Sequence, residues 1–170
     1  MGLFDLFRTA DKGDRDLVLL RAVRTEMPAA AEEDVKIVAA MAGLLGQVAY
    51  ADRPFLPAEE APIRQALGRV AGLTPDGAER ICATLRSSIS AIAEVEAREY
   101  ANFLRELADR ELRLYVLDLL LDVAAADENV SMVEVNLVRR LTTVLGLTQD
   151  EYNTSQARHR THLSRPRPVS

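Results

Sequence analysis

Apolar residues recur every three or four positions along most of the chain, and this spacing predicts amphipathic helices rather than strands. Ala, Leu, Glu and Arg dominate these segments, and all four residue types favour the helical conformation. The pattern therefore predicts an all-α bundle of about seven helices. The expected helices are a short one that ends before Pro28, then 31–51, 57–71, 75–87, 94–108, 110–126 and 131–145, and a short last one over 148–157.

Two of these segments carry further information about the bundle. Residues 110–126 have the broadest apolar face, which includes Leu112, Leu119 and Val123. Because a helix with a broad apolar face needs partners on several sides, we expect this helix at the centre of the bundle. The serines within residues 87–90 weaken the helical pattern, so we expect a break or kink there.

The most informative stretch, residues 123–147, reads as a helix–loop–helix unit. An apolar helix runs to Asp127, and a short polar loop follows. Ser131 then begins a second helix, with Glu134 three residues later. Serine followed at this spacing by glutamate, before an apolar run, is the signature of a capping box. The sequence therefore predicts a second helix that begins at Ser131.

A related unit occupies residues 48–67, so the helix–loop–helix pattern is present twice. In our alignment the first loop is one residue longer than the second. The aligned pairs are Asp52 with Asp127, Pro57 with Ser131 and Glu60 with Glu134. Proline at the first position of a helix has a preset φ angle and favours a helix start, as serine does at the cap.

The second unit resembles the TerB family in its Ala-Asp at the end of an apolar helix, its Ser-x-x-Glu and its closing Leu-Gly-Leu. This family includes the tellurite-resistance TerB proteins and the N-terminal domain of DjlA-type co-chaperones. The resemblance covers roughly residues 35–152. It implies a helical domain linked to tellurite and other stress responses, in a family proposed to bind metal ions. Recruitment of a chaperone in the DjlA manner requires a J-domain, and its His-Pro-Asp motif does not occur in this sequence.

The acidic loops are the candidate functional site. In the second unit, side chains with oxygen atoms alternate along the loop, and a glutamate follows on the first helical turn. Oxygen ligands at alternate positions surround hard cations in tight loops, so a divalent cation, calcium above all, is the expected ligand. The candidate metal ligands are Asp127, Asn129, Ser131 and Glu134 in the second unit, and Asp52 and Glu60 in the first.

The same residues have a purely structural interpretation. Ser131 and Glu134 satisfy each other's backbone N–H groups at the start of a helix, and such a cap contributes about 1 kcal/mol to stability. Asp127 would close the preceding turn through its own side chain. Asp122 precedes Asp127 by a spacing that is not a whole number of helical turns, so we expect these two carboxylates to point apart.

Charge is distributed unevenly along the chain. The net charge is −5, but the segment after Glu151 contains four arginines and no acidic residue, so the rest of the chain is more acidic than this value. An acidic body argues against nucleic acid as a partner, because nucleic-acid affinity comes largely from Lys and Arg on phosphates. It is compatible with a cation or a basic protein partner.

The sequence offers little for catalysis. Both histidines, His159 and His162, fall in the basic tail, and the lone Cys82 lies in an apolar helical stretch. No glycine-rich phosphate loop, nucleophile elbow or His/Cys metal cluster is present in the sequence. We therefore expect a protein that is not an enzyme.

The termini differ in character from the central domain. We expect an apolar segment with a short helix in residues 1–30, the TerB-like domain in 31–157, and a basic, disordered tail in 158–170. The first segment packs onto the domain or forms a peripheral contact with a membrane or partner helix. Its apolar residues are Leu3, Phe4, Leu6 and Phe7. A lone cysteine does not require an oxidising compartment, and we see no signal peptide, so we expect a cytoplasmic protein.

The sequence leads to two hypotheses about function. The first is a non-enzymatic, TerB-like stress-response module that binds a divalent cation or a protein partner through its acidic loops. The alternative is a scaffold or co-chaperone-like adaptor, in contact with a membrane or not, in which the loops are helix caps and no ion binds. Only the first requires Asp127 and Glu134 for more than stability.

Overall fold

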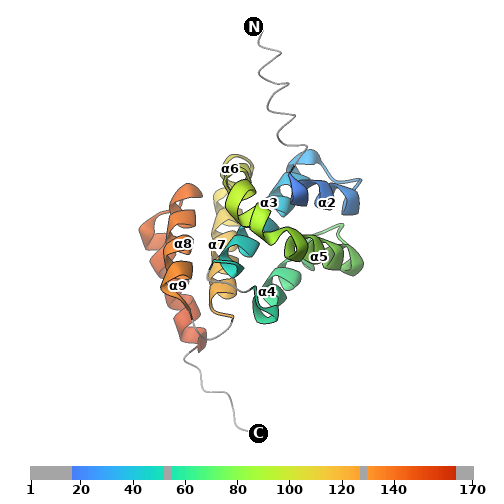
Figure 1. Ribbon diagram of the computed structural model, residues 1–170. Coiled ribbons are helices and arrows are strands. Elements are labelled where there is room, and N and C mark those ends of the chain that lie inside the picture. The colour runs from blue at the N-terminus through green and yellow to red at the C-terminus, as the bar shows by residue number, and fades with distance from the viewer. Residues whose placement is uncertain (1–16, 52–54, 127–129, 164–170) are drawn as a thin grey trace.

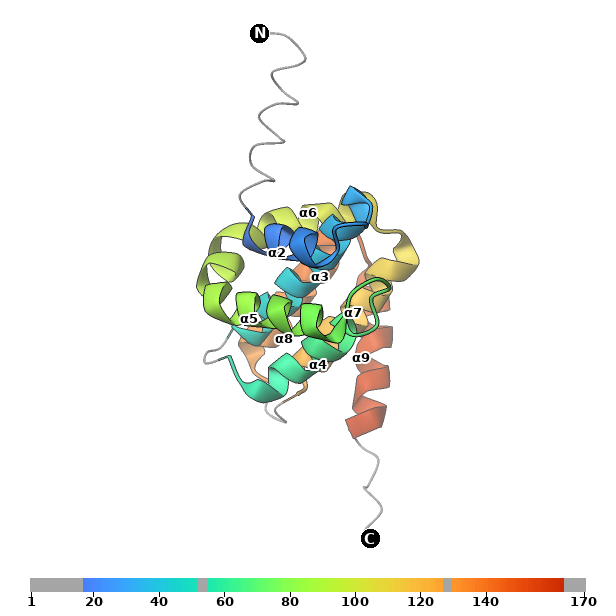
Figure 2. The ribbon, with the colours of Figure 1, turned by 90° about the vertical axis from the view of Figure 1, so that its right-hand side faces the viewer.

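The computed structural model describes residues 17–51, 55–126 and 130–163, and it confirms the all-α class (Figures 1 and 2). Within these residues every regular element is helical. If the uninterrupted run α5–η1–α6 is counted as one bent helix, the described chain forms seven helices. The elements are α2 (Val18–Glu26), α3 (Glu32–Ala49), α4 (Pro57–Leu67), α5 (Pro75–Ala91), the π-helical segment η1 (Ile92–Glu96), α6 (Ala97–Leu107), α7 (Arg110–Ala124), α8 (Met132–Val144) and α9 (Gln149–Leu163).

The central helix is α3, and our expectation that the helix of residues 110–126 would take this place was wrong. From Val38 to Ala49 nearly every residue of α3 is buried, and α3 contacts α2, α4, α5, η1, α6, α7 and α8. Two glycines allow this close packing. A Cβ on Gly43 would lie 2.6 Å from the Tyr100 ring, and a Cβ on Gly46 would lie 2.5 Å from Leu85.

The run from α5 through η1 to α6 is bent twice. The first bend is at Ser88, whose φ of −122° and ψ of 15° are not helical, and this confirms the kink expected at residues 87–90. The second is the π-helical turn of η1, where the wider helix changes which side chains face inward. Ile92 and Glu96 are buried there, whereas Val95 is 76% exposed. The bends let one continuous run of helix fold around α3.

The start of α2 is held by two polar side chains from the far end of this run. Leu17 at the N-cap position makes no side-chain cap. Instead, the Glu96 carboxylate accepts the N–H of Val18 at 3.2 Å, and the Tyr100 hydroxyl accepts the N–H of Leu19 at 3.1 Å. The Tyr100 hydroxyl in turn donates a hydrogen bond to the Glu96 carboxylate at 2.7 Å. The orphan N–H groups of a helix start are therefore satisfied from another part of the fold.

The helices α3–α4 and α7–α8 form two equivalent units, as the repeated pattern predicts. The ends of α3 and α7, at Ala49 and Ala124, and the starts of α4 and α8, at Pro57 and Met132, are the same number of residues apart. The second helix of each unit packs on the first helix of the other, since α4 contacts α7 and α8 contacts α3. The pair of units therefore has approximate twofold symmetry around α3 and α7.

The last helix is longer than the sequence pattern indicated. It continues to Leu163, although we expected it to end near Ala157 and placed a disordered tail from residue 158. Ion pairs with α7 hold the first residues of this extension. Arg158 lies 3.3 Å from Asp118, and Nε2 of His159 lies 2.8 Å from Asp122. Such contacts between helices favour continued helix over a solvated tail.

Removal of the Tyr100 hydroxyl should destabilise the protein through α2. In Tyr100→Phe the N–H of Leu19 loses its buried acceptor and Glu96 loses a donor, so we expect the free energy of unfolding to fall by about 1–3 kcal/mol. Urea titration followed by circular dichroism measures this change. Tyr115→Phe is the matched control, because the Tyr115 hydroxyl accepts a hydrogen bond from Arg69 near the surface, and a change of less than about 0.5 kcal/mol is expected there. Equal effects in both variants would contradict this account of α2.

The contact of α9 with α7 should weaken as the pH rises. Nδ1 of His159 faces the carbonyl oxygen of Ser155 at 2.8 Å and Nε2 faces Asp122, so the doubly protonated ring satisfies both acceptors. The hydrogen bond to Asp122 raises the pKa of His159, with further contributions from the Ser155 carbonyl and from Asp118. The stabilisation is complete below the unfolded-state pKa of about 6.5 and is lost as the pH rises through the folded-state pKa.

This pH dependence is measured by NMR titration of the His159 ring together with urea unfolding across the same pH range. Asp122→Asn should return the pKa of His159 toward about 6.5 and flatten the pH dependence of stability. Asp150→Asn, an exposed change on the first turn of the same helix, serves as the control. A wild-type His159 that titrates at or below about 6.5 would refute the prediction. Arg158 also lies on this face of α9, so its positive charge is present in every variant.

Candidate functional site

The start of α8 has the capping box that the sequence predicts. The Ser131 hydroxyl accepts the N–H of Glu134 at 3.1 Å, and the Glu134 carboxylate accepts the N–H of Ser131 at 2.8 Å. The Glu134 side chain is fully buried. The carboxylate at the end of the second loop is therefore held in a fixed position by the backbone of its own helix start.

The start of α4 has only half of this arrangement. The Glu59 carboxylate accepts the N–H of Leu56 at 2.7 Å, as Glu134 does at Ser131. Leu56, however, is the N-cap residue and has no side-chain oxygen to return a bond. Glu59 is also buried, with 1% exposure. The first unit thus keeps the glutamate half of a capping box but lacks the N-cap hydroxyl.

This comparison corrects our alignment of the two units by one residue. Leu56 rather than Pro57 occupies the N-cap position that Ser131 holds in the second unit. Glu59 rather than Glu60 is therefore the counterpart of Glu134. With this register the loops have equal length, and the first loop is not one residue longer.

Glu60 instead belongs to a network of ion pairs between α4 and α5. It is 6% exposed and pairs with Arg64, one turn later on α4, and with Arg86 of α5 at 2.8 Å. Arg64 and Arg86 also bind Glu79, and the hydrogen bond from Arg64 lowers the pKa of that carboxyl below its usual range. A cation at Glu60 would therefore compete with two guanidinium groups.

The two loop ends lie at one end of the bundle. Ala58 and Pro62, early in α4, line the same surface hollow as Ala126 at the end of α7. On the other side of the pseudo-twofold, Val133 on the first turn of α8 lines a hollow with Tyr50 at the end of α3. The approximate symmetry therefore brings each helix start beside the helix end of the other unit.

Several residues of the candidate sites lie outside the described residues. In the described part of the chain, no three His, Cys, Asp or Glu side chains are grouped as metal ligands. Ion binding at the loops consequently stays a prediction. The candidate residues that the structure does not describe are Asp52, Asp127 and Asn129 of the loops and Leu3, Phe4, Leu6 and Phe7 of the apolar segment.

Cys82 and His159 are not arranged for catalysis. Cys82 is fully buried, and burial raises the pKa of its thiol to about 11, with a further contribution from Glu60. It is therefore protonated at neutral pH and a weak nucleophile. Both ring nitrogens of His159 are occupied by Ser155 and Asp122.

Exposed apolar side chains follow the second loop, and they are not among the residues predicted to have a function. Val130 is 45% exposed, Met132 68% and Val133 52%. They precede the inward-facing positions of α8. The apolar residues of Val-Ser-Met-Val at the helix start do not fit the helical spacing of those positions, and this mismatch was the sequence signal that could have indicated exposed apolar side chains. The hollow beside Val133 is also lined by Ala93 of η1, two residues before the exposed Val95. Exposed apolar side chains that gather near one loop are typical of an interaction surface.

The described helices give no sign of a membrane span. None of them combines the length and the apolar character needed to cross a bilayer.

Comparison with known proteins supports the resemblance noted from the motif. The family model described as tellurite resistance protein TerB matches residues 38–157, which run from within α3 to within α9. The match includes the second helix–loop–helix unit and all of the first except the start of α3. Searches of the curated proteins and of the solved structures returned no match.

Loss of the Ser131 cap should cost stability whether or not an ion binds. We expect Ser131→Ala to lower the free energy of unfolding by about 1 kcal/mol, because the N–H of Glu134 loses its acceptor. Thr148→Ala is the matched variant, since Thr148 and Glu151 make the same reciprocal pair at α9. Urea unfolding in the presence of EDTA measures both. Unchanged stability in Ser131→Ala would exclude a structural role for this cap.

Proposed function

The chain belongs to the TerB family, and from this premise we propose that it is a cytoplasmic, non-enzymatic module of tellurite resistance and related stress responses. Its second acidic loop binds a divalent cation, with calcium favoured. The position of Glu134, a buried carboxylate fixed at the end of that loop, is the observation that carries the proposal.

Glu134 supports the proposal because its geometry is set before any ligand arrives. One of its oxygen atoms accepts the N–H of Ser131, which fixes the side chain toward the loop end of α8. In the sequence, Asp127 and Asn129 come just before it and supply further oxygen atoms. A hard cation with several oxygen ligands suits such a set, and calcium tolerates the irregular geometry of a short loop better than magnesium.

The structure favours the second loop over the first. Leu56 stands where the second unit has the Ser131 hydroxyl, so the first unit has one oxygen fewer. Glu60, which we had named as a candidate ligand, is engaged by Arg64 and Arg86. We therefore propose one cation site per chain rather than two.

A second candidate function is binding of a protein partner by the same end of the bundle. The exposed Val130, Met132 and Val133 beside the second loop favour it, because apolar side chains at the centre of an interface contribute most of its affinity. In this interpretation the protein is an adaptor, and the loops need no ion.

Calorimetric titration distinguishes the two functions. After treatment with EDTA and its removal, the protein is titrated with calcium, magnesium, manganese and zinc. We expect saturable heat with calcium in the wild type and none in Asp127→Ala. Asp52→Ala is the matched control at the equivalent position of the first unit, and it should bind as the wild type does.

The Glu134→Gln variant shows whether Glu134 is a metal ligand or only caps the helix. The amide oxygen of glutamine still accepts the N–H of Ser131, whereas the negative charge is removed. We expect weaker calcium binding with nearly unchanged urea stability of the ion-free protein. If no ion produces heat up to millimolar concentration, the cation proposal is wrong and the adaptor function is the one that remains.

A further inference from the structure

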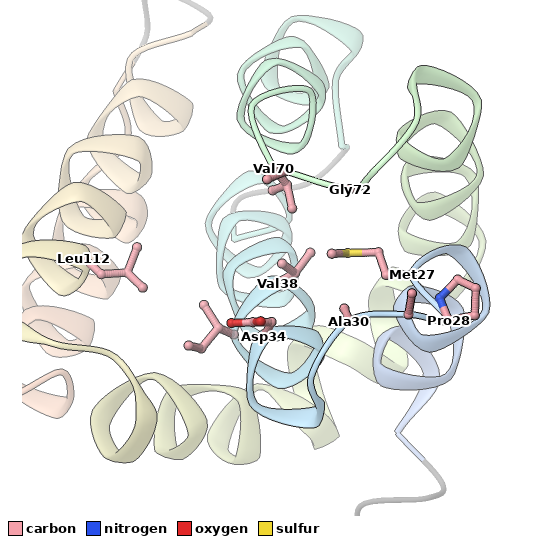
Figure 3. Close-up of a pocket in the computed structure, with 11 residues that line it drawn as sticks. Met27, Pro28, Ala30, Asp34, Val38, Val70, Gly72 and Leu112 are labelled. Atoms are coloured by element: carbon pink, nitrogen blue, oxygen red, sulfur yellow. The ribbon is translucent and has the colours of Figure 1, made fainter.

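An apolar groove lies between the α2–α3 link and the α4–α5 link, away from the two acidic loops (Figure 3). Its volume is about 510 Å³. Met27 and Ala30 form one wall, Val70 forms another, and Val38 of α3 lies between them. This size falls within the range of sites that hold a ligand or several side chains of a peptide.

The chemistry of the groove is almost entirely apolar. Ala30, Ile37, Val70 and Leu112 are only partly buried, so they keep apolar surface open to solvent. The single charged residue of the lining is Asp34, on the first turn of α3 (Figure 3). An occupant that fits these walls has several large apolar side chains and one positive charge.

We propose that residues 3–8 of this chain, Leu-Phe-Asp-Leu-Phe-Arg, dock in this groove. Phe4 and Phe7 are three residues apart and would share one face of a helical turn, which is the spacing of anchors in a helix-in-groove contact. They are two of the four phenylalanines in the sequence. Arg8 follows at once and supplies the positive charge for Asp34.

The distances allow this contact within one chain. The described chain begins at Leu17, just before α2, and the other end of α2 leads into Met27 at the wall of the groove. Nine helical residues span about 14 Å. Residues 9–16 bridge up to about 26 Å when extended, which exceeds that span. A tether of this length keeps the segment near the groove at an effective concentration on the order of millimolar.

The docked state would determine whether the apolar segment is available to other surfaces. In the groove, Phe4 and Phe7 are covered by the protein's own helices. Released, the same residues are free to contact a lipid surface or a partner. The groove would therefore be a holding site for the segment, separate from the acidic loops, and the contact does not depend on a bound cation.

Paramagnetic broadening in the full chain tests the contact. Thr9→Cys provides one reactive thiol for a nitroxide label, because Cys82 is fully buried and its thiol pKa is raised. We expect the amide signals of Ala30, Asp34 and Ala71 around the groove to broaden. The signal of Val133 on α8 should stay sharp, because Val133 lines a hollow with Tyr50, which lies about 24 Å along α3 from Asp34.

Two variants bearing the same label show whether the groove is responsible. Phe4→Asp with Phe7→Asp removes the anchors without touching a described helix. Ala30→Trp fills the partly buried wall of the groove. We expect the broadening around the groove to be lost in both. Retention of the wild-type pattern in both variants, or equal broadening at Val133, would overturn the proposal.

A mixture of labelled chains without nitrogen-15 and unlabelled chains with nitrogen-15 distinguishes contact within one chain from contact between copies. Broadening that disappears on mixing supports the proposal. Broadening that persists in the mixture overturns it and assigns the groove to a second copy. If the segment leaves the groove signals sharp and binds only to phosphatidylglycerol vesicles, the proposal is likewise wrong and the segment is a membrane contact.

Discussion

The burial of α3 on nearly every side is the constraint on which the rest of the fold depends. A helix in this position has no face for charged side chains, and α3 carries its charged residues only in its first turn and at Lys36. Its partners must approach closely, which Gly43 and Gly46 permit, because a Cβ at either place would collide with Tyr100 or Leu85. The bent run from α5 to α6 wraps this helix. Tyr100 then joins the central contact to the start of α2 through its hydroxyl.

Sequence periodicity was sufficient to predict the helices, but it did not predict which helix lies at the centre of the bundle. The segment of α7 has the broader apolar stripe, yet α7 also carries Asp118 and Asp122, which face α9 and pair with Arg158 and His159. An amphipathic stripe shows that a helix is buried on one side, whereas burial on all sides depends on small residues, whose contribution is steric rather than hydrophobic. The extension of α9 escaped prediction for a related reason. The first residues of the extension form ion pairs with residues some forty positions earlier, and no local pattern encodes these pairs.

The candidate site likewise has one feature that the sequence predicts and one that it does not. The Ser131–Glu134 pair could be predicted because a capping box is local, and both of its hydrogen bonds join residues three positions apart. The pairing of Glu60 with arginines could not be predicted, because Arg86 approaches it from another helix. Alignment by residue type alone favoured Glu60 over Glu59 as the counterpart of Glu134. The backbone decides otherwise, since only Glu59 reaches back to the N-cap N–H in the first unit. Periodicity therefore located the repeat, and hydrogen bonding was needed to set its register.

The two units consequently share a backbone arrangement and differ in chemistry. Each places a buried glutamate at the third position of its second helix, so this carboxylate is part of how the unit folds. A cation site would need more than that shared feature. The second unit adds the Ser131 hydroxyl, whereas the first has Leu56 at that position and directs its next carboxylate, Glu60, to two arginines. The approximate twofold of the fold thus does not extend to its electrostatics. Since Arg64 and Arg86 already neutralise Glu60 at the start of α4, a ligand with positive charge would gain more at the second loop.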